Sequence, residues 1–253
     1  MNPSTARPRL IAHRGYSQRY PENTLLALEA ALDAGADYIE FDVQFTADQV
    51  PVVFHDSELA RMTGSEGIIQ ETSFAALARL RVSEVDRLGE ACAPQPIPSL
   101  EAVLALLQRW PQATAFVEIK TETLRQFGVD PVVEILLAAL QPVRSQCYLI
   151  SFDETVLARA RQAGQSRIGW AIRDWSSAAQ QQARVLAPDV LFCNAQKIGA
   201  EALWPGPWQW ALYDIVDPEE ALRWFARGAD FIETWDIGGL LQDPRLRGER
   251  ADD

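Results

Sequence analysis

The only two histidines in the chain each follow a short apolar segment. His13 comes directly after Leu10–Ala12, and His55 comes directly after Val50–Phe54. An imidazole has an unperturbed pKa of about 6.5, so two of them can serve as general base and general acid at neutral pH. Any imidazole chemistry in this protein must therefore use His13 and His55.

Three carboxylates lie in or just after similar segments. Glu40 and Asp42 alternate with apolar residues over 38–43, and Glu118 follows the apolar run 115–117. On a strand, residues spaced i, i+2 point to the same side, about 6–7 Å apart. Three carboxylates with no nearby cysteine suit a hard cation such as Mg²⁺ or Ca²⁺. The alternative is that Glu40 and Asp42 pair with arginine or lysine.

Two basic residues accompany these groups. Arg14 stands between His13 and Gly15, and Lys120 stands two positions after Glu118. Glycine permits a tight turn, and a guanidinium can hold a phosphate through two parallel hydrogen bonds. An inward-pointing Lys120 could offset phosphate charge in the same site. The alternatives are a helix-cap histidine with a surface arginine, and a solvated lysine at a strand end.

Short strands alternating with helices would have to position these residues. The segment from Pro21 and Glu22 to Gly35 reads as a helix, and Asp153 precedes another. Strand-then-helix repetition over this length predicts an α/β fold, best a TIM (β/α)₈ barrel and second a doubly wound sheet. The predicted strands are Leu10–Ala12, Tyr38–Val43, Val50–Phe54, Ala115–Ile119, Tyr148–Ser151, Ile168–Ile172, Val190–Cys193, Trp208–Leu212 and Asp230–Glu233.

Nine predicted strands exceed the eight places of a barrel. The gap between Val43 and Val50 is too short for a crossover helix, so one segment should be an extra hairpin strand or no strand. Ser57–Pro98 is too long for a simple connection. We expect one domain over 1–253, with 57–98 as a small inserted subdomain after the third strand, over one barrel mouth.

Composition excludes several classes of protein. The chain has 253 residues, 48% hydrophobic and 23% charged, which is typical of a globular domain. No apolar run of membrane-spanning length and no secretory signal is evident, and three scattered cysteines indicate a reducing compartment, so we expect a cytoplasmic protein. A net charge of −12 disfavours nucleic acid and stable membrane association. We expect a monomer or homodimer.

The order and spacing of eight short strings resemble the glycerophosphodiester phosphodiesterase family. The resemblance runs from His13 to about Leu240, nearly the whole chain. The strings are Ala12–Gly15, Pro21–Thr24, Glu40–Val43, Thr46–Asp48, Val50–Asp56, Ile97–Leu100, Val117–Lys120 and Ser151–Asp153.

This resemblance implies a metal-dependent enzyme on a TIM barrel. The reaction would be hydrolysis of a small glycerophosphodiester to sn-glycerol 3-phosphate and an alcohol, with one divalent cation, Mg²⁺ or Ca²⁺. Seven residues receive roles: metal ligands Glu40, Asp42 and Glu118, acid/base residues His13 and His55, and phosphate-binding residues Arg14 and Lys120.

The chain departs from the family pattern near its C-terminus. Where the family commonly shows WTVN, Tyr213 stands for the tryptophan and Val216 for the asparagine. Glu233 lies at a strand end, where it could bind hydroxyls or form a salt bridge. These positions would shape the substrate pocket, so they affect the preferred alcohol. Glu22 and Asn23 match a turn that we expect to shape the mouth and support the site.

Two other functions compete with this one. A lysophospholipase D-like or sphingomyelinase D-like phosphodiesterase on the same scaffold would need an apolar groove for acyl chains, which Trp204, Trp208 and Trp210 could form. The same tryptophans could instead pack in the barrel wall or outer helices. A non-catalytic phosphate-binding barrel would be expected to lack a catalytic group.

Overall fold

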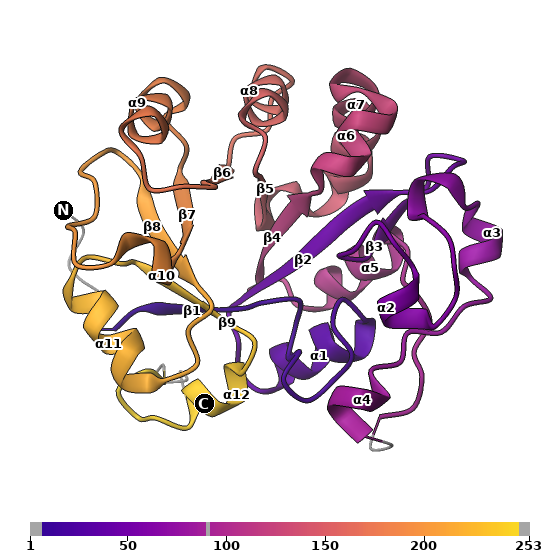
Figure 1. The fold of residues 1–253 in the computed structure, drawn as a ribbon, viewed down its shortest axis with the longest axis horizontal. Helices are drawn as coiled ribbons and strands as arrows, with labels where there is room; N and C mark the ends of the chain where they lie inside the picture. The colour runs from indigo at the N-terminus through magenta and orange to yellow at the C-terminus, as the bar shows by residue number, and fades with distance from the viewer. Residues whose placement is uncertain (1–6, 90–91, 248–253) are drawn as a thin grey trace.

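A nine-stranded sheet closes into a barrel in the computed structural model, which describes residues 7–89 and 92–247 (Figure 1). Strand β1 pairs in parallel with β2 on one side and with β9 on the other, which closes the ring. The barrel strands are β1 (Arg9–Ala12), β2 (Tyr38–Phe45), β4 (Thr114–Ile119), β5 (Cys147–Ser151), β6 (Ile168–Ala171), β7 (Val190–Asn194), β8 (Gln209–Tyr213) and β9 (Phe231–Thr234).

The ninth strand is β3 (Pro51–Val53), and it pairs antiparallel with the end of β2. Among the described strands it is the only antiparallel one, so it is the extra hairpin strand expected from the short gap before it. The remaining eight parallel strands confirm the predicted TIM barrel and exclude the doubly wound sheet.

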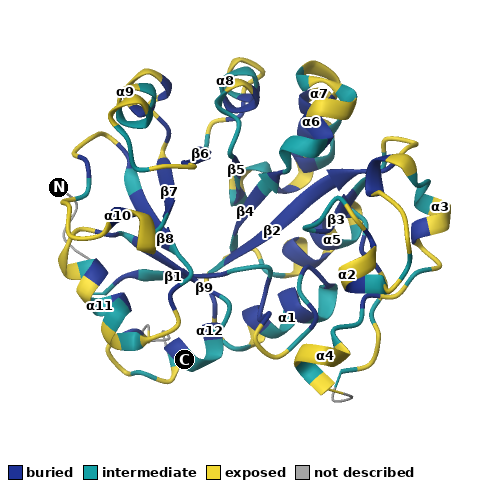
Figure 2. Ribbon diagram, viewed as in Figure 1, coloured by how far each residue is buried: buried dark blue, intermediate teal, exposed yellow. Residues whose placement is uncertain are grey.

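The longer helices lie outside the strands, and their inner faces are buried (Figure 2). Short helical segments complete the connections. The segments are α1 (Leu25–Asp33), α2 (Ala60–Thr63), η1 (Ile69–Glu71), α3 (Phe74–Leu77), α4 (Val85–Leu88), α5 (Leu100–Arg109), α6 (Thr121–Phe127), α7 (Val129–Leu140), η3 (Gln141–Gln146), α8 (Glu154–Gln162), α9 (Ser177–Leu186), α10 (Ala195–Ile198), α11 (Pro218–Ala226) and α12 (Ile237–Leu241).

Side-chain caps fix where several helices begin. Asp153 caps α8 as expected, accepting from the backbone N–H of Thr155. The prediction that a helix opens at Pro21 is wrong. Thr24 caps α1 instead, because its hydroxyl accepts from Ala27 N–H while donating to the carbonyl of Pro21. Pro21 and the following residue are thereby left in the β1–α1 connection.

Side chains inside the barrel change from apolar to charged toward the carboxyl ends of the strands. Phe116 lies two residues before Glu118 in β4, and Phe231 lies two residues before Glu233 in β9, so each pair faces the same way. Phe116 packs edge-to-face on Phe192 and Phe231, with ring centroids 5.2 and 5.7 Å apart. These rings fill the barrel beneath the charged groups.

The segment 57–98 packs around its own apolar cluster. That cluster includes Leu59, Met62 and Leu77, together with Val52 and Phe54 from the hairpin. The segment follows β3, the third strand along the chain, and contains α2, η1, α3 and α4. The labelled helices α2, α3 and α4 lie on the side of the barrel that carries β3 and α5 (Figure 1). We propose that it be regarded as a small subdomain within a single barrel domain.

Candidate active site

The three carboxylates predicted as metal ligands converge at the carboxyl end of the barrel. Asp42 on β2 and Glu118 on β4 are register partners, and Glu40 precedes Asp42 on the same face. One oxygen of each lies within 4.8 Å of the others. Glu40 and Asp42 are each only 1% exposed. The parallel register of β2 and β4 therefore brings together acids that are far apart in sequence.

Both predicted phosphate-binding cations lie against these acids. Lys120 Nζ is 3.2 Å from Asp42 Oδ1 and 2.9 Å from Glu118 Oε1. Arg14 Nε is 3.2 Å from Asp42 Oδ2, a close ion pair whose angle is not that of a hydrogen bond. The alternative that Asp42 pairs with basic residues is thus present, and it coexists with the convergence of the acids.

Burial and the surrounding charges shift the pKa values of the three acids in different directions. Burial alone would raise the pKa of Asp42, but Lys120 and Arg14 outweigh it and hold that pKa well below its usual value. Burial and the Asp42 charge raise the pKa of Glu40 well above normal. Burial also raises the pKa of Glu118, despite the opposing attraction of Lys120. The pKa values of Glu40 and Glu118 are therefore raised even though two basic side chains lie against the group.

An unpartnered oxygen makes the acidic group suitable for a cation. Glu40 Oε1 is buried and has no hydrogen-bond partner among the described residues. Glu40 Oε2 accepts from the backbone N–H of Arg14, at 3.0 Å. Buried polar groups are normally paired, and carboxylate oxygens are the ligands that Mg²⁺ and Ca²⁺ prefer. Glu40, Asp42 and Glu118 thus fit a divalent cation in donor type and proximity.

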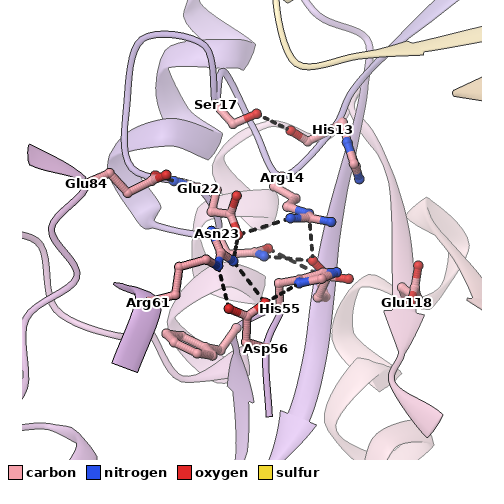
Figure 3. Close-up of polar contacts among 12 residues, drawn as sticks. His13, Arg14, Ser17, Glu22, Asn23, His55, Asp56, Arg61, Glu84 and Glu118 are labelled. Carbon is pink, nitrogen blue, oxygen red and sulfur yellow. Dashed lines mark hydrogen bonds and ion pairs between the residues drawn. The ribbon is translucent and has the colours of Figure 1, made fainter. Parts of the chain in front are cut away.

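His13 stands where β1 ends and a tight turn begins. Its N–H donates to Thr234 of β9, at 2.9 Å, and its carbonyl accepts from the Ser17 hydroxyl (Figure 3). Its Nε2 lies 3.9 Å from Glu40 Oε2. Burial, reinforced by the Arg14 charge, lowers the pKa of His13 well below its usual value, which favours the neutral imidazole.

His55 follows the hairpin strand and is held by a chain of ion pairs. Its Nδ1 lies 2.6 Å from Asp56 Oδ1, and Arg61 of α2 engages both oxygens of Asp56. Arg61 also contacts Glu22 at 2.6 Å, and Glu22 contacts Arg14 at 3.1 Å (Figure 3). The inserted segment thereby links the environments of the two histidines.

Asn23 braces the central acid from the β1–α1 connection. Its Nδ2 donates to Asp42 Oδ2 at 2.8 Å, and its Oδ1 accepts from the Asp42 backbone N–H at 3.1 Å. Asn23 adopts a left-handed backbone with φ of 58°. A non-glycine residue held there by two hydrogen bonds to one acid indicates a local conformation shaped around Asp42.

Two hollows meet above the carboxylates. The inner one has a volume of about 160 Å³ and reaches His13, Glu40 and Glu233. The outer one has a volume of about 400 Å³ and reaches Arg61 and Arg173 at the mouth. We call them the inner and outer chambers. Both are lined by His55, Glu118, Lys120 and Phe152. A ligand crossing that shared boundary would contact one histidine and the lysine.

Sequence reasoning did not find every residue of the site. The ion pairs of Asp56 with Arg61, and the position of Asp214 in the inner chamber, were missed. Asp56 stood next to a predicted catalytic histidine, which was a usable signal. Asp214 lies two residues after the predicted strand Trp208–Leu212, so its place near a strand end was also a usable signal.

The tryptophans considered for an acyl-chain groove are buried in packing. Trp204, Trp208 and Trp210 belong to the core, and Trp204 stacks on Trp175 with ring centroids 3.9 Å apart. They do not form an open groove at the mouth. No helix within residues 7–89 and 92–247 has the length and apolar character needed to cross a bilayer.

The sequence pattern of the glycerophosphoryl diester phosphodiesterase family matches residues 13–210. A glycerophosphodiester phosphodiesterase of Bacillus altitudinis is 34% identical over 150 residues, covering 59% of this chain and 60% of that protein. Glycerophosphodiester phosphodiesterase 1 of Bos taurus is 28% identical over 251 residues, covering 90% of this chain and 71% of that protein. The chain thus spans 60% of the length of the bacterial relative.

Solved structures share the fold over almost the whole chain. A glycerophosphodiester phosphodiesterase from Parabacteroides distasonis has a TM-score of 0.79 and 22% identity, covering 94% of this chain and 97% of that one. An Oleispira antarctica phosphodiesterase in complex with the product sn-glycerol 3-phosphate has a TM-score of 0.78 and 22% identity, covering 93% and 96%. At this identity the likeness concerns the fold.

Proposed function

Because the chain belongs to the glycerophosphoryl diester phosphodiesterase family, we propose that it hydrolyses glycerophosphodiesters to sn-glycerol 3-phosphate and an alcohol. The relatives named as glycerophosphodiester phosphodiesterases support this reaction. The related Oleispira enzyme, described with sn-glycerol 3-phosphate as its product, supports the choice of product. The observation that carries the proposal is the convergence of three acids, two cations and both histidines around two joined chambers.

Glu40, Asp42 and Glu118 would hold one divalent cation, Mg²⁺ or Ca²⁺. The chemistry supplied by such a cation is polarisation of the phosphoryl oxygens and stabilisation of charge on them. Glu40 gives the strongest support for a bound cation, since its Oε1 is buried and has no hydrogen-bond partner among the described residues. Asn23 keeps Asp42 oriented for the same purpose through two hydrogen bonds.

Lys120 at the boundary between the chambers and Arg14 in the inner chamber would hold the phosphate. An ammonium has three donors, and Lys120 uses two directions on Asp42 and Glu118, which leaves one for the substrate. Arg14 uses Nε toward Asp42 and one terminal nitrogen toward Glu22, which leaves its other terminal nitrogen available. Both cations therefore offset charge that builds on the phosphate in the transition state.

The chambers suggest how the histidines divide the proton transfers. His13 faces only the inner chamber, so as a neutral imidazole it takes the proton of the nucleophile, which is water or the glycerol 2-hydroxyl. His55 faces both chambers, so it gives a proton to the departing alcohol oxygen as the phosphorus–oxygen bond breaks. Burial opposes ionisation of Asp56, but Arg61 and His55 lower its pKa, so an ionised Asp56 can orient the His55 ring through its contact with Nδ1.

Turnover of defined substrates tests the proposal. Purified protein is assayed with glycerophosphocholine and glycerophosphoethanolamine in Mg²⁺, Ca²⁺ or Mn²⁺, with sn-glycerol 3-phosphate followed by phosphorus NMR. We expect hydrolysis that stops after exhaustive chelation. Loss of a residue that only supports a metal ligand typically weakens cation affinity about tenfold or more. Glu40→Gln and Asp42→Asn change the ligands themselves, so each should weaken the affinity at least about tenfold. Full activity after dialysis into EDTA would contradict the metal role.

Glu101→Gln provides a matched control, because Glu101 is an exposed carboxylate in the first turn of α5. It removes the same charge from the chain without touching either chamber. Lysophosphatidylcholine tests the lysophospholipase D-like alternative, which the buried tryptophans disfavour. Faster hydrolysis of lysophosphatidylcholine than of glycerophosphocholine would replace the proposed substrate class.

A further inference from the structure

One carboxylate of the inner chamber has no role in the reaction described above. Glu233 lies on β9 and points inward, two residues after Phe231 of the aromatic barrel filling. The residue is 4% exposed, and its Oε1 has no hydrogen-bond partner among the described residues. No described arginine or lysine lies within ion-pair distance of Glu233. The salt-bridged interpretation of Glu233 is therefore wrong for the described part of the chain.

A buried carboxylate without a partner is costly, so it calls for an occupant of the chamber. Leaving a buried donor or acceptor unsatisfied costs about 1–3 kcal/mol, and more for a charged group. Burial and nearby Glu118 and Asp214 raise the pKa of Glu233 well above its usual value, which agrees with this cost. In either protonation state the carboxyl group can accept a hydrogen bond from a hydroxyl.

A second acid faces the same chamber from the neighbouring strand end. Asp214 follows β8 and adopts a left-handed backbone with φ of 69°. The amide nitrogen of Asn194 donates to Asp214 Oδ2, and Asp214 lines the inner chamber together with Glu233. Non-glycine residues held in this conformation are found where the surroundings enforce them, often at ligand sites. Asp214 is thus held by its surroundings in a fixed position facing the same chamber as Glu233.

The rest of the chamber combines apolar and charged walls, and its volume is about 160 Å³. This volume is less than half that of the outer chamber, so the inner chamber suits the smaller part of a substrate. Ile150, Ala171, Phe192 and the ring of Tyr213 form an apolar part, and the polar and charged part consists of His13, Arg14, Glu40, His55, Glu118 and Lys120. A ligand that places C–H groups against the apolar walls and hydroxyls against the two acids is a short polyol. The phosphate would be drawn to Arg14 and Lys120, which leaves Glu233 and Asp214 for the hydroxyls.

We propose that Glu233 and Asp214 are specificity-determining residues that accept hydrogen bonds from the free hydroxyls of the glycerol unit. This rests on the proposed hydrolysis of glycerophosphodiesters and adds that the substrate class is set by a diol on one side of the phosphate. The alcohol on the other side lies in the larger outer chamber.

Comparison of two substrates tests the role of Glu233. Glycerophosphocholine offers the diol, whereas bis(p-nitrophenyl) phosphate has no hydroxyl. We expect Glu233→Ala to lower the ratio of their kcat/KM values at least about tenfold, mainly through KM for glycerophosphocholine, because buried hydroxyl contacts give about that discrimination. Asp214→Ala should lower the ratio in the same direction, and Glu101→Gln should leave it unchanged.

The conservative variants and the product keep the test decisive if the alanine variants do not fold. Glu233→Gln retains a carbonyl acceptor and should restore part of the ratio. In the wild type, sn-glycerol 3-phosphate should inhibit more strongly than inorganic phosphate, and Glu233→Gln should narrow this difference. An unchanged ratio and an unchanged inhibition difference in every variant would overturn the proposal.

Two further outcomes separate this inference from the function on which it rests. If the wild type hydrolyses neither substrate, the proposed function fails first. His13, Glu40 and Glu233 also offer ligand atoms within 4.8 Å of one another, so a second cation is a competing explanation. Metal analysis showing two bound cations in the wild type and one in Glu233→Ala, with both substrates slowed equally, would assign Glu233 to metal binding and overturn the proposal.

Discussion

At the residue scale, the two histidines occupy different electrostatic environments. His13 is buried beside the Arg14 charge, which lowers its pKa, while His55 contacts Asp56 at 2.6 Å. The lowered pKa of His13 favours the neutral imidazole that a general base needs. His55 differs from it in having a carboxylate against its Nδ1.

Removal of either imidazole should therefore be severe. We expect His13→Ala and His55→Ala each to lower kcat by about 10²–10⁴-fold, the usual contribution of one positioned proton transfer. The chain has no third histidine that could replace them. Steady-state kinetics on glycerophosphocholine provide the measurement, with Glu101→Gln as the control. Near-normal turnover in either alanine variant would show that the acid/base assignment is wrong.

At the element scale, the loop after β1 must pass very close to α1. Gly15 has φ of 79°, and a Cβ built on it would lie 2.5 Å from the backbone carbonyl carbon of Ala27. Tyr16 N–H also donates to the Ala27 carbonyl at 2.8 Å. This close approach places Arg14 at the barrel mouth, because the turn leaves no room for any side chain at position 15.

Substitution of Gly15 should therefore destabilise the fold through two effects. We expect Gly15→Ala to lose about 1–2 kcal/mol from the left-handed backbone and about 1–3 kcal/mol more from the clash, measured by urea unfolding. Gly64→Ala is the matched control, because Gly64 has φ of 68° and nothing within 4 Å of its Cβ position. Equal losses in the two variants would show that the close approach has no energetic weight.

The sequence predicted the elements well because strand and helix signals are local. Eight barrel strands, the extra hairpin strand and the residues at strand ends all followed from short-range patterns and the family resemblance. The contacts made by the insertion could not be predicted in this way. Arg61 pairs with Glu22 across 39 positions, and Glu84 accepts from the Glu22 backbone N–H across 62. Such pairings depend on the docking of α2 and α4, which no local pattern specifies.

At the scale of the whole molecule, the barrel concentrates acids in its interior as well as on its surface. Burial, reinforced by neighbouring carboxylates, raises the pKa values of Glu40, Glu118 and Glu233. Each then binds its proton more tightly when folded than when unfolded. Stability from these groups is present in acid and is lost as pH rises above about 4.3, their ordinary value. Asp42 behaves oppositely, losing its contribution only below about 3.9.

The metal-free protein should therefore become less stable as the pH rises. We expect the free energy of unfolding in EDTA to fall between pH 5 and pH 8, while saturating Mg²⁺ raises it, by about 2.7 kcal/mol at a hundred times Kd. The increase should be larger at pH 8, where the folded carboxylates are less protonated. Calorimetric unfolding at both pH values provides the measurement. A Mg²⁺ effect that is absent, or larger at pH 5, would contradict a carboxylate metal site.

Closure of the barrel by the pairing of β1 with β9 has a consequence for biosynthesis. Among the described strands β1 is made first, yet one of its two neighbours, β9, is made last. At about 5–20 residues per second, the roughly 220 residues between them take roughly 10–45 s to translate. During that interval the edge of β1 that will pair with β9 has no partner strand. Ribosome-bound chaperones could therefore bind this edge until β9 is made.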